Sequence, residues 1–95
     1  MKFETNIINA YKVKMDITIW EQEKICWLNN FKVPEKFRHK RIGSKSLNEL
    51  IDFCKENGYT LKLLIPKQEL KEFYLPFGFK EVFENDVQYL VKEPK

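Results

Sequence analysis

The hydrophobic period of the chain changes at Gly43, and this change limits the folds that the sequence can adopt. Before it, apolar and polar side chains alternate strictly from Tyr11 to Trp20, which predicts a strand with one buried face. After it, apolar residues recur at the spacing of one helix face, and Asn57-Gly58 forms a left-handed stop signal. The residues on this predicted helix face are Leu47, Leu50, Ile51 and Cys54.

Turn signals and short apolar runs predict the remaining elements. The polar stretch Glu21–Lys24 is typical of a hairpin turn, and Pro34 ends the strand that follows it. We expect the buried face of that second strand to carry Ile25, Trp27, Phe31 and Val33. Further on, the sequence predicts a buried strand over Tyr59–Ile65, a helix over Gln68–Leu75, a closing hairpin of Phe79–Phe83 and Val87–Val91, and an extra edge strand within Met1–Asn9.

This order of elements indicates one domain over residues 1–95 with an α+β or α/β fold. We expect a mixed, mostly antiparallel, twisted sheet of about five to six strands with two helices. A hydrophobic content of 43%, with 15% aromatic residues, is enough for such a chain to fold around a core.

Several classes of protein are disfavoured by composition. No apolar run is long enough for a membrane helix and no signal peptide is evident, so we expect a soluble, cytoplasmic protein that does not bind a membrane. Cys26 and Cys54 lack metal-site spacing, which predicts reduced, buried thiols and no metal. The net charge of +3 is spread among 14 acidic residues, which argues against a nucleic-acid partner.

Both arginines of this lysine-rich chain, Arg38 and Arg41, lie in one short loop directly before Gly43 and the predicted helix. Arginine binds phosphate bidentately, and the first N–H groups of a helix have no internal acceptor. The loop therefore predicts a phosphate-binding site, although its single glycine does not match a P-loop. The simpler interpretation is that both arginines are solvated loop charges.

The segment VPEKFRHKRIGSKSL resembles the signature of the GNAT superfamily of acyl-CoA N-acyltransferases. In that signature a strand ending in Val-Pro is followed by Arg/Gln-x-x-Gly-x-Gly/Ala and a helix. The strand LKLLIP and the segment EFYLPFGF, which is similar to the family's Phe-Tyr-x-x-x-Gly-Phe segment, follow in the same order. The resemblance covers Ile25 to Phe79 and implies a minimal GNAT fold that uses acetyl-CoA.

The resemblance also implies roles for individual residues. Main-chain N–H groups near Phe31, Lys32 and Val33 would polarise the thioester carbonyl, and Tyr74 would protonate the departing thiolate. A core tyrosine is the alternative for Tyr74, and close helix packing is a compatible second role for Gly43. The residues expected around the coenzyme A pyrophosphate are Arg38, His39, Lys40, Arg41, Ile42, Gly43 and Ser44. His39 lies away from the expected amine, so a solvated loop residue is its alternative interpretation.

The sequence departs from the family pattern at two positions. Arg41 stands where the family has its first glycine, which requires that Arg41 keep helical backbone angles, and Lys67 stands where an asparagine often opens the second helix. No carboxylate lies between Ile25 and Val33 to serve as general base. The open alternatives are Asp16, Glu23 or Glu35 as the base, or a water positioned by Asn29 or Asn30, which could instead form a strand bulge.

Arg38 is preceded by 37 residues, too few for the two helices that usually wall the acceptor site in the family. We therefore expect an open acceptor side that suits a protein or peptide amine, or a site completed by a second subunit in a homodimer. Trp20 and Trp27 are interpreted as core or partner contacts, with substrate platforms as the alternative. The main hypothesis is an acetyl-CoA-dependent N-acetyltransferase acting on a protein lysine. The alternatives are a non-catalytic binding module of the same fold and, more remotely, a nucleic-acid binder.

Overall fold

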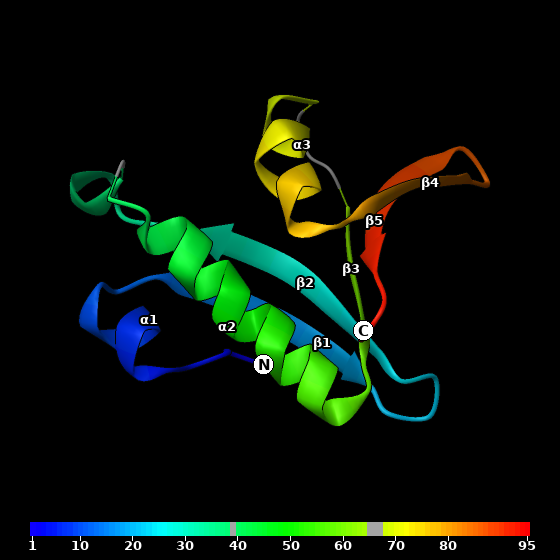
Figure 1. Ribbon diagram of the computed structural model, residues 1–95, viewed down its shortest axis with the longest axis horizontal. Helices are drawn as coiled ribbons and strands as arrows, with labels where there is room; N and C mark the ends of the chain where they lie inside the picture. Colours follow the sequence, from blue (N-terminus) through cyan, green and yellow to red (C-terminus); the bar gives the residue numbers. More distant parts are fainter. Residues whose placement is uncertain (39, 65–67) are drawn as a thin grey trace.

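The computed structural model describes residues 1–38, 40–64 and 68–95 (Figure 1). In chain order the elements are α1 (Asn6–Ala10), β1 (Lys14–Trp20), β2 (Ile25–Lys32), α2 (Ile42–Asn57), β3 (Thr60–Leu64), α3 (Gln68–Tyr74), β4 (Lys80–Glu84) and β5 (Val87–Lys92), with 3₁₀ turns at Glu35–Phe37 and Leu75–Phe77. None of the helices in these described ranges is long and apolar enough to cross a membrane.

The strands form one sheet in the order β1-β2-β3-β5-β4. The β2 and β3 strands are parallel, as a helix crossover between them requires, and the other neighbouring pairs are antiparallel. Asn85 and Asp86 both have positive φ, which is the backbone of a two-residue hairpin turn between β4 and β5. The predicted fold class is therefore confirmed, and the described residues form five strands and three α-helices instead of two.

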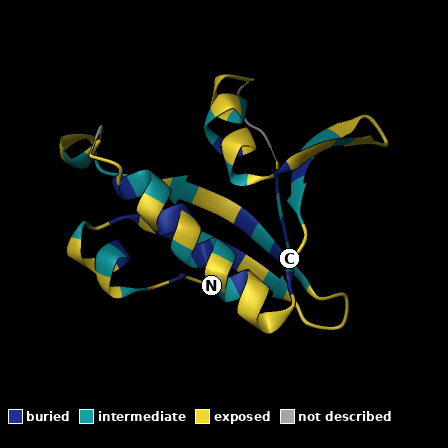
Figure 2. Cartoon of the chain, in the orientation of Figure 1, coloured by how far each residue is buried: buried dark blue, intermediate teal, exposed yellow. Residues whose placement is uncertain are grey.

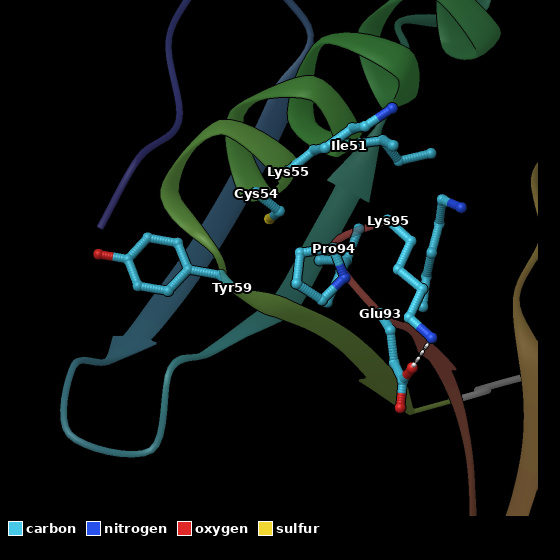
Figure 3. Close-up of a pocket in the computed structure, with 9 residues that line it drawn as sticks. Ile51, Cys54, Lys55, Tyr59, Glu93, Pro94 and Lys95 are labelled. Carbon is cyan, nitrogen blue, oxygen red and sulfur yellow. Dashed lines mark ion pairs between the residues drawn. The ribbon is translucent and has the colours of Figure 1, made fainter.

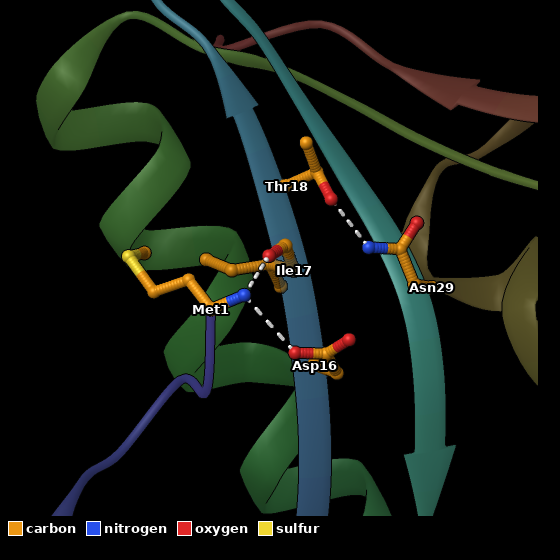
Figure 4. Close-up of polar contacts among 5 residues, drawn as sticks. All are labelled: Met1, Asp16, Ile17, Thr18 and Asn29. Carbon is orange, nitrogen blue, oxygen red and sulfur yellow. Dashed lines mark hydrogen bonds and ion pairs between the residues drawn. The ribbon is translucent and has the colours of Figure 1, made fainter.

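The expected edge strand at the N-terminus is wrong, because residues 6–10 form α1. Thr5 caps this helix by accepting a hydrogen bond from the Ile8 N–H at 3.1 Å, and the Ile8 side chain is fully buried. Sheet pairing is limited to an isolated bridge between Lys2 and Asp16. The Met1 ammonium donates to the Ile17 carbonyl at 2.9 Å and lies 3.1 Å from the Asp16 carboxylate (Figure 4).

The buried face of β2 was predicted wrongly for its first half. Cys26 and Leu28 are buried, whereas Ile25 and Trp27 point to the opposite face and are half-buried. The register explains the error, because Asp16 pairs with Asn30 while Ile17 pairs with Leu28, which leaves Asn29 as an extra residue. This bulge shifts the alternation by one residue, so that Phe31 and Val33 lie on the same face as Leu28.

All three helices lie on one face of the sheet. Figure 1 shows α2 crossing β1 and β2, and its buried residues Leu47, Leu50 and Cys54 confirm the predicted helix face. The α3 helix packs on the same face, because Lys71 forms an ion pair with Glu81 and Gln68 donates to Gln88 at 3.2 Å. The opposite face of the sheet has no helix from the described ranges over it. In Figure 2 the buried residues accordingly gather between α2 and the strands behind it.

Both cysteines are buried free thiols, as predicted. The α2 helix ends at Gly58, whose φ of 72° confirms the left-handed stop signal. Trp20 and Trp27 lie on the uncovered face of the sheet, with their ring centroids 5.7 Å apart. They are therefore not part of the main core between the sheet and the helices.

Candidate functional site

The N-terminus of α2 presents several backbone donors that the helix itself does not use. The first intrahelical bond runs from the Lys45 N–H to the Arg41 carbonyl at 3.0 Å. The N–H groups of residues 41–44 therefore have no acceptor within the helix. No hydrogen bond from a described side chain caps this end. Four free donors and the positive end of the helix dipole together favour an anion.

A cavity of about 240 Å³ lies over this helix end, and we name it the phosphate cavity for the anion that its donors favour. Arg38 is held beside it because its Nε donates to the Val33 carbonyl at 3.3 Å, which leaves the terminal guanidinium nitrogens free for another acceptor. The residues that line the cavity are Val33, Phe37, Arg38, Arg41, Ile42, Gly43, Ser44 and Phe73. The cavity therefore combines backbone donors with the only two arginines of the chain, a donor set that fits a pyrophosphate.

Gly43 lies where α2 passes closest to the end of β2. A Cβ built on it would be 3.5 Å from the Val33 Cγ2 and 3.7 Å from the Phe73 Cζ, which are ordinary packing distances. Helix-to-strand packing would thus accept alanine here. Gly43 also lines the cavity, so an added methyl group would reduce the room there.

A larger cleft, of about 500 Å³, opens where β2 and β3 separate. Their pairing covers Ile25–Leu28 of β2, and β2 then continues away from β3 to Lys32 (Figure 1). Ligands commonly bind where neighbouring parallel strands part at their carboxyl ends. The cleft is lined by Trp27, Leu28, Asn29, Asn30, Phe31, Leu63, Leu64, Leu70 and Tyr74.

The cleft and the phosphate cavity are neighbours. Phe31 lines the cleft and Val33 the cavity, and likewise Tyr74 lines the cleft while Phe73 lines the cavity. Tyr74 ends α3 and is buried between Phe73 and Phe79, with ring centroids 5.1 and 5.7 Å away. Burial raises the pKa of Tyr74 to about 12, so its hydroxyl keeps its proton at neutral pH.

The candidate bases from the sequence do not meet in this cleft. Asp16 is engaged by the Met1 ammonium, Glu23 lies in the exposed β1–β2 turn, and Glu35 is exposed in the first 3₁₀ turn. None of the residues lining the cleft in the described part of the chain is acidic. Asn29 forms the bulge and donates to the Thr18 hydroxyl at 2.6 Å, which leaves its side-chain carbonyl free (Figure 4).

A third cavity, at the other end of α2, is too small to matter for cofactor binding. It holds about 10 Å³, roughly one water molecule, between Tyr59, Cys54 and the C-terminal residues (Figure 3). The Lys95 ammonium lies 3.6 Å from the Glu93 carboxylate beside it. We therefore place the candidate site at the cleft and the neighbouring phosphate cavity.

Most of the residues singled out in the sequence line the cleft or the phosphate cavity. Lys32 and Lys40 are exposed and line neither, and His39 and Lys67 lie outside the described residues. The sequence did not single out Phe73, Leu64 or Leu70, which also line the site. In the sequence these three residues are distinguished only by being apolar, and core residues share that property.

The expectation that Arg41 keeps helical backbone angles is wrong, because this residue is not helical. It is the N-cap of α2 and has a φ of 62°, the left-handed region in which a non-glycine residue is strained. The position therefore keeps the backbone of a glycine while carrying an arginine side chain at the cavity wall. Strain of this kind often accumulates at functional sites.

Two substitutions that both remove the guanidinium isolate this strain. We expect Arg41→Gly to have a free energy of unfolding about 1 kcal/mol above that of Arg41→Ala, because only alanine retains the left-handed penalty. Urea unfolding of the two variants measures the difference. Equal stabilities would mean that Arg41 is unstrained.

Comparisons with known proteins agree with this geometry. The family model of the acetyltransferase (GNAT) family matches residues 10–79. A search of curated proteins found no match. Among solved structures, an acetyltransferase of the GNAT family from Staphylococcus aureus Mu50 superposes with a TM-score of 0.70 at 20% identity, over 87% of this chain and 60% of that chain. PaiA N-acetyltransferase from Thermoplasma acidophilum, in complex with coenzyme A, superposes with a TM-score of 0.70 at 20% identity, over 85% and 52%.

Partners differ among such structures, since a KacTA–DNA complex also superposes, with a TM-score of 0.68 at 13% identity over 86% of this chain and 57% of that chain. At these identities the likeness shows the fold, and the chain spans between half and 60% of the length of these structures. The GNAT family uses acetyl-CoA, and the free donors and arginines at the start of α2 fit its pyrophosphate. With the family model matching well over half of its residues, the chain belongs to the GNAT family of acetyltransferases.

Proposed function

We propose that this chain is an acetyl-CoA-dependent N-acetyltransferase that transfers the acetyl group directly to a primary amine of a protein or peptide, with a lysine side chain as the favoured acceptor. The observation that carries the proposal is the uncapped N-terminus of α2 beside the cleft between β2 and β3. A phosphate-binding end and a cleft for the thioester are thus adjacent, as this transfer needs.

The residues take the following roles. The N–H groups of residues 41–44, with Arg38 and Arg41, bind the pyrophosphate, and Phe31 lines the cleft that receives the pantetheine arm. Backbone N–H groups after the bulge stabilise the oxyanion that forms when the neutral amine attacks the thioester carbonyl. The Tyr74 hydroxyl gives its proton to the departing thiolate, and the proton that the attacking nitrogen loses restores the tyrosine, so a thiol and a neutral amide are released.

Calorimetric titration with acetyl-CoA is the direct test of cofactor binding. We expect micromolar binding of acetyl-CoA and of desulfo-CoA at moderate salt, and much weaker binding of inorganic phosphate. Absence of binding at millimolar acetyl-CoA would contradict the proposal.

The pH dependence of turnover tests the absence of a carboxylate base. A lysine amine has a pKa near 10.4, so its neutral fraction rises about tenfold per pH unit below that value. Tyr74, whose pKa is raised to about 12 by burial, stays protonated throughout this range. We therefore expect kcat/KM for a peptide lysine to rise steadily from pH 7 to 9. A plateau near pH 7 would instead reveal a base with a lower pKa.

A non-catalytic binding module of the same fold is the second candidate function. It is favoured by the lack of acidic residues in the described cleft lining and by the arginine at the first glycine position of the motif. This candidate predicts acetyl-CoA binding without acetyl transfer to any amine, or neither. Mass spectrometry of a peptide library incubated with acetyl-CoA distinguishes the two.

A further inference from the structure

The face of the sheet opposite the helices carries an aromatic strip. Trp20 and Trp27 pack edge to face, and the Trp27 and Tyr89 ring centroids lie 6.1 Å apart. Trp20 is 46% exposed, and the same face of the sheet also carries Leu64 of β3 at 57% and Val87 of β5 at 45%. Exposed apolar groups that gather on one face, with polar residues around them, are typical of an interaction surface.

Lysines share this face of the sheet with the strip. Lys14 and Lys32 are directly opposite each other in the β1–β2 register, and both are exposed. The Lys62 ammonium lies between two rings, 5.8 Å from the Trp27 centroid and 5.3 Å from the Tyr89 centroid. Like charges placed opposite each other across a strand pair are unfavourable unless an anion lies near them.

The carboxylates of this face are already engaged. By the strand register the acidic residues that share the face are Asp16 and Glu84. Asp16 contacts the Met1 ammonium at 3.1 Å, and Glu84 accepts a hydrogen bond from the Tyr89 hydroxyl at 2.6 Å. The lysines that share this face of the strands are Lys14, Lys32, Lys62 and Lys80. They outnumber its two carboxylates, so the strands carry a net positive charge on this face.

The strip is continuous with the cleft. Trp27 of the strip lines the cleft between β2 and β3, and so does Leu64, which lies on the same uncovered face. An acceptor amine that reaches the cleft from this side must pass over the lysines while it carries its own positive charge. Carboxylates next to that amine would offset the repulsion, and apolar side chains beside them would cover the aromatic strip.

We propose that this face docks an acidic segment of the acceptor protein, with apolar residues on Trp20, Trp27 and Tyr89 and carboxylates near Lys14, Lys32 and Lys62. The proposal rests on the proposed acetyltransferase function only in naming the docked protein as the acetyl acceptor. The docking itself does not require catalysis. A second copy of the chain fits less well, because it would bring two positive faces together.

Tryptophan fluorescence tests the docking, because both tryptophans of the chain lie on this face. The probes are 15-residue peptides with a central norleucine in place of lysine and with flanks of Glu and Leu, or of Arg and Leu. The peptide with acidic flanks should shift the emission and bind at least tenfold more tightly than the peptide with basic flanks. Raising the salt from 0.05 to 0.5 M should reduce this difference.

Matched variants assign the binding to the face. Lys14→Glu should weaken binding of the acidic peptide about tenfold, whereas Lys55→Glu, on the exposed side of α2, should not change it. Trp20→Ala should weaken binding by a similar factor. Its control is Phe83→Ala, because Phe83 is 71% exposed but shares a face with Gln88 rather than Tyr89.

The results separate this proposal from the proposed function. Equal binding of the two peptides, or an unchanged affinity in Lys14→Glu, would overturn the docking proposal even if acetyl-CoA binds and peptides are acetylated. A stable dimer whose formation shifts the tryptophan emission, detected by sedimentation, would overturn it as well. Selective binding of the acidic peptide without any binding of acetyl-CoA would retain the docking face and refute the acetyltransferase.

Discussion

Gly43→Ala is expected to weaken acetyl-CoA binding by about 30-fold, or about 2 kcal/mol, while leaving the fold intact. The added methyl group fits between Val33 and Phe73 at ordinary packing distances, so the core does not have to move. It would, however, take up room in the cavity that Gly43 lines, beside the N–H groups proposed to bind the pyrophosphate. Hydrogen bonds to a charged group contribute about 1.5–3 kcal/mol each. Calorimetry measures the affinity, and thermal unfolding measures the stability.

The stability of this variant should be unchanged or up to about 1 kcal/mol higher, because alanine is favoured over glycine in a helix. Gly58→Ala is the opposite control. Gly58 has a φ of 72° with open space around it, so alanine there should lower stability by about 1 kcal/mol and leave acetyl-CoA binding unchanged. If Gly43→Ala binds acetyl-CoA like the wild type, the glycine serves helix packing alone.

Tyr74→Phe is expected to lower kcat about 100-fold or more, with little change in acetyl-CoA affinity. The change removes only the hydroxyl of a residue that lines the cleft, and it retains the ring that packs against Phe73 and Phe79. Loss of a general acid typically costs 10²–10⁴ in rate. Steady-state kinetics with a lysine peptide and calorimetry with acetyl-CoA separate the two effects.

Tyr59→Phe is the matched control for this second prediction. The Tyr59 hydroxyl donates to the Glu21 carboxylate at 2.7 Å, at the β1–β2 turn, and it lines neither the cleft nor the phosphate cavity. Its loss should reduce stability slightly and leave kcat unchanged. Turnover of Tyr74→Phe at the wild-type rate would show that Tyr74 is a core residue and that the thiolate leaves without its proton.

Local patterns were sufficient to predict most of the elements. The alternation in β1, the face of α2 and the stop at Gly58 each depend on neighbouring residues and on the periods of strand and helix. The face of β2 could not be predicted in this way, because the bulge at Asn29 depends on the register with β1. Similarly, α1 replaced an expected strand because burial of Ile8 and the Thr5 cap outweighed a short apolar run.

The candidate site, like the fold, could be predicted only in part from the sequence. The sequence alone predicted a phosphate-binding loop, since two arginines and a glycine before a helix are adjacent residues, and it singled out Tyr74 by resemblance to a family segment. Three features are evident only in the folded protein: β2 and β3 part to open a cleft, Arg41 is left-handed, and a face with aromatic residues and lysines lies uncovered. These features arise from strand register and from packing between residues far apart in the chain, which no local pattern encodes.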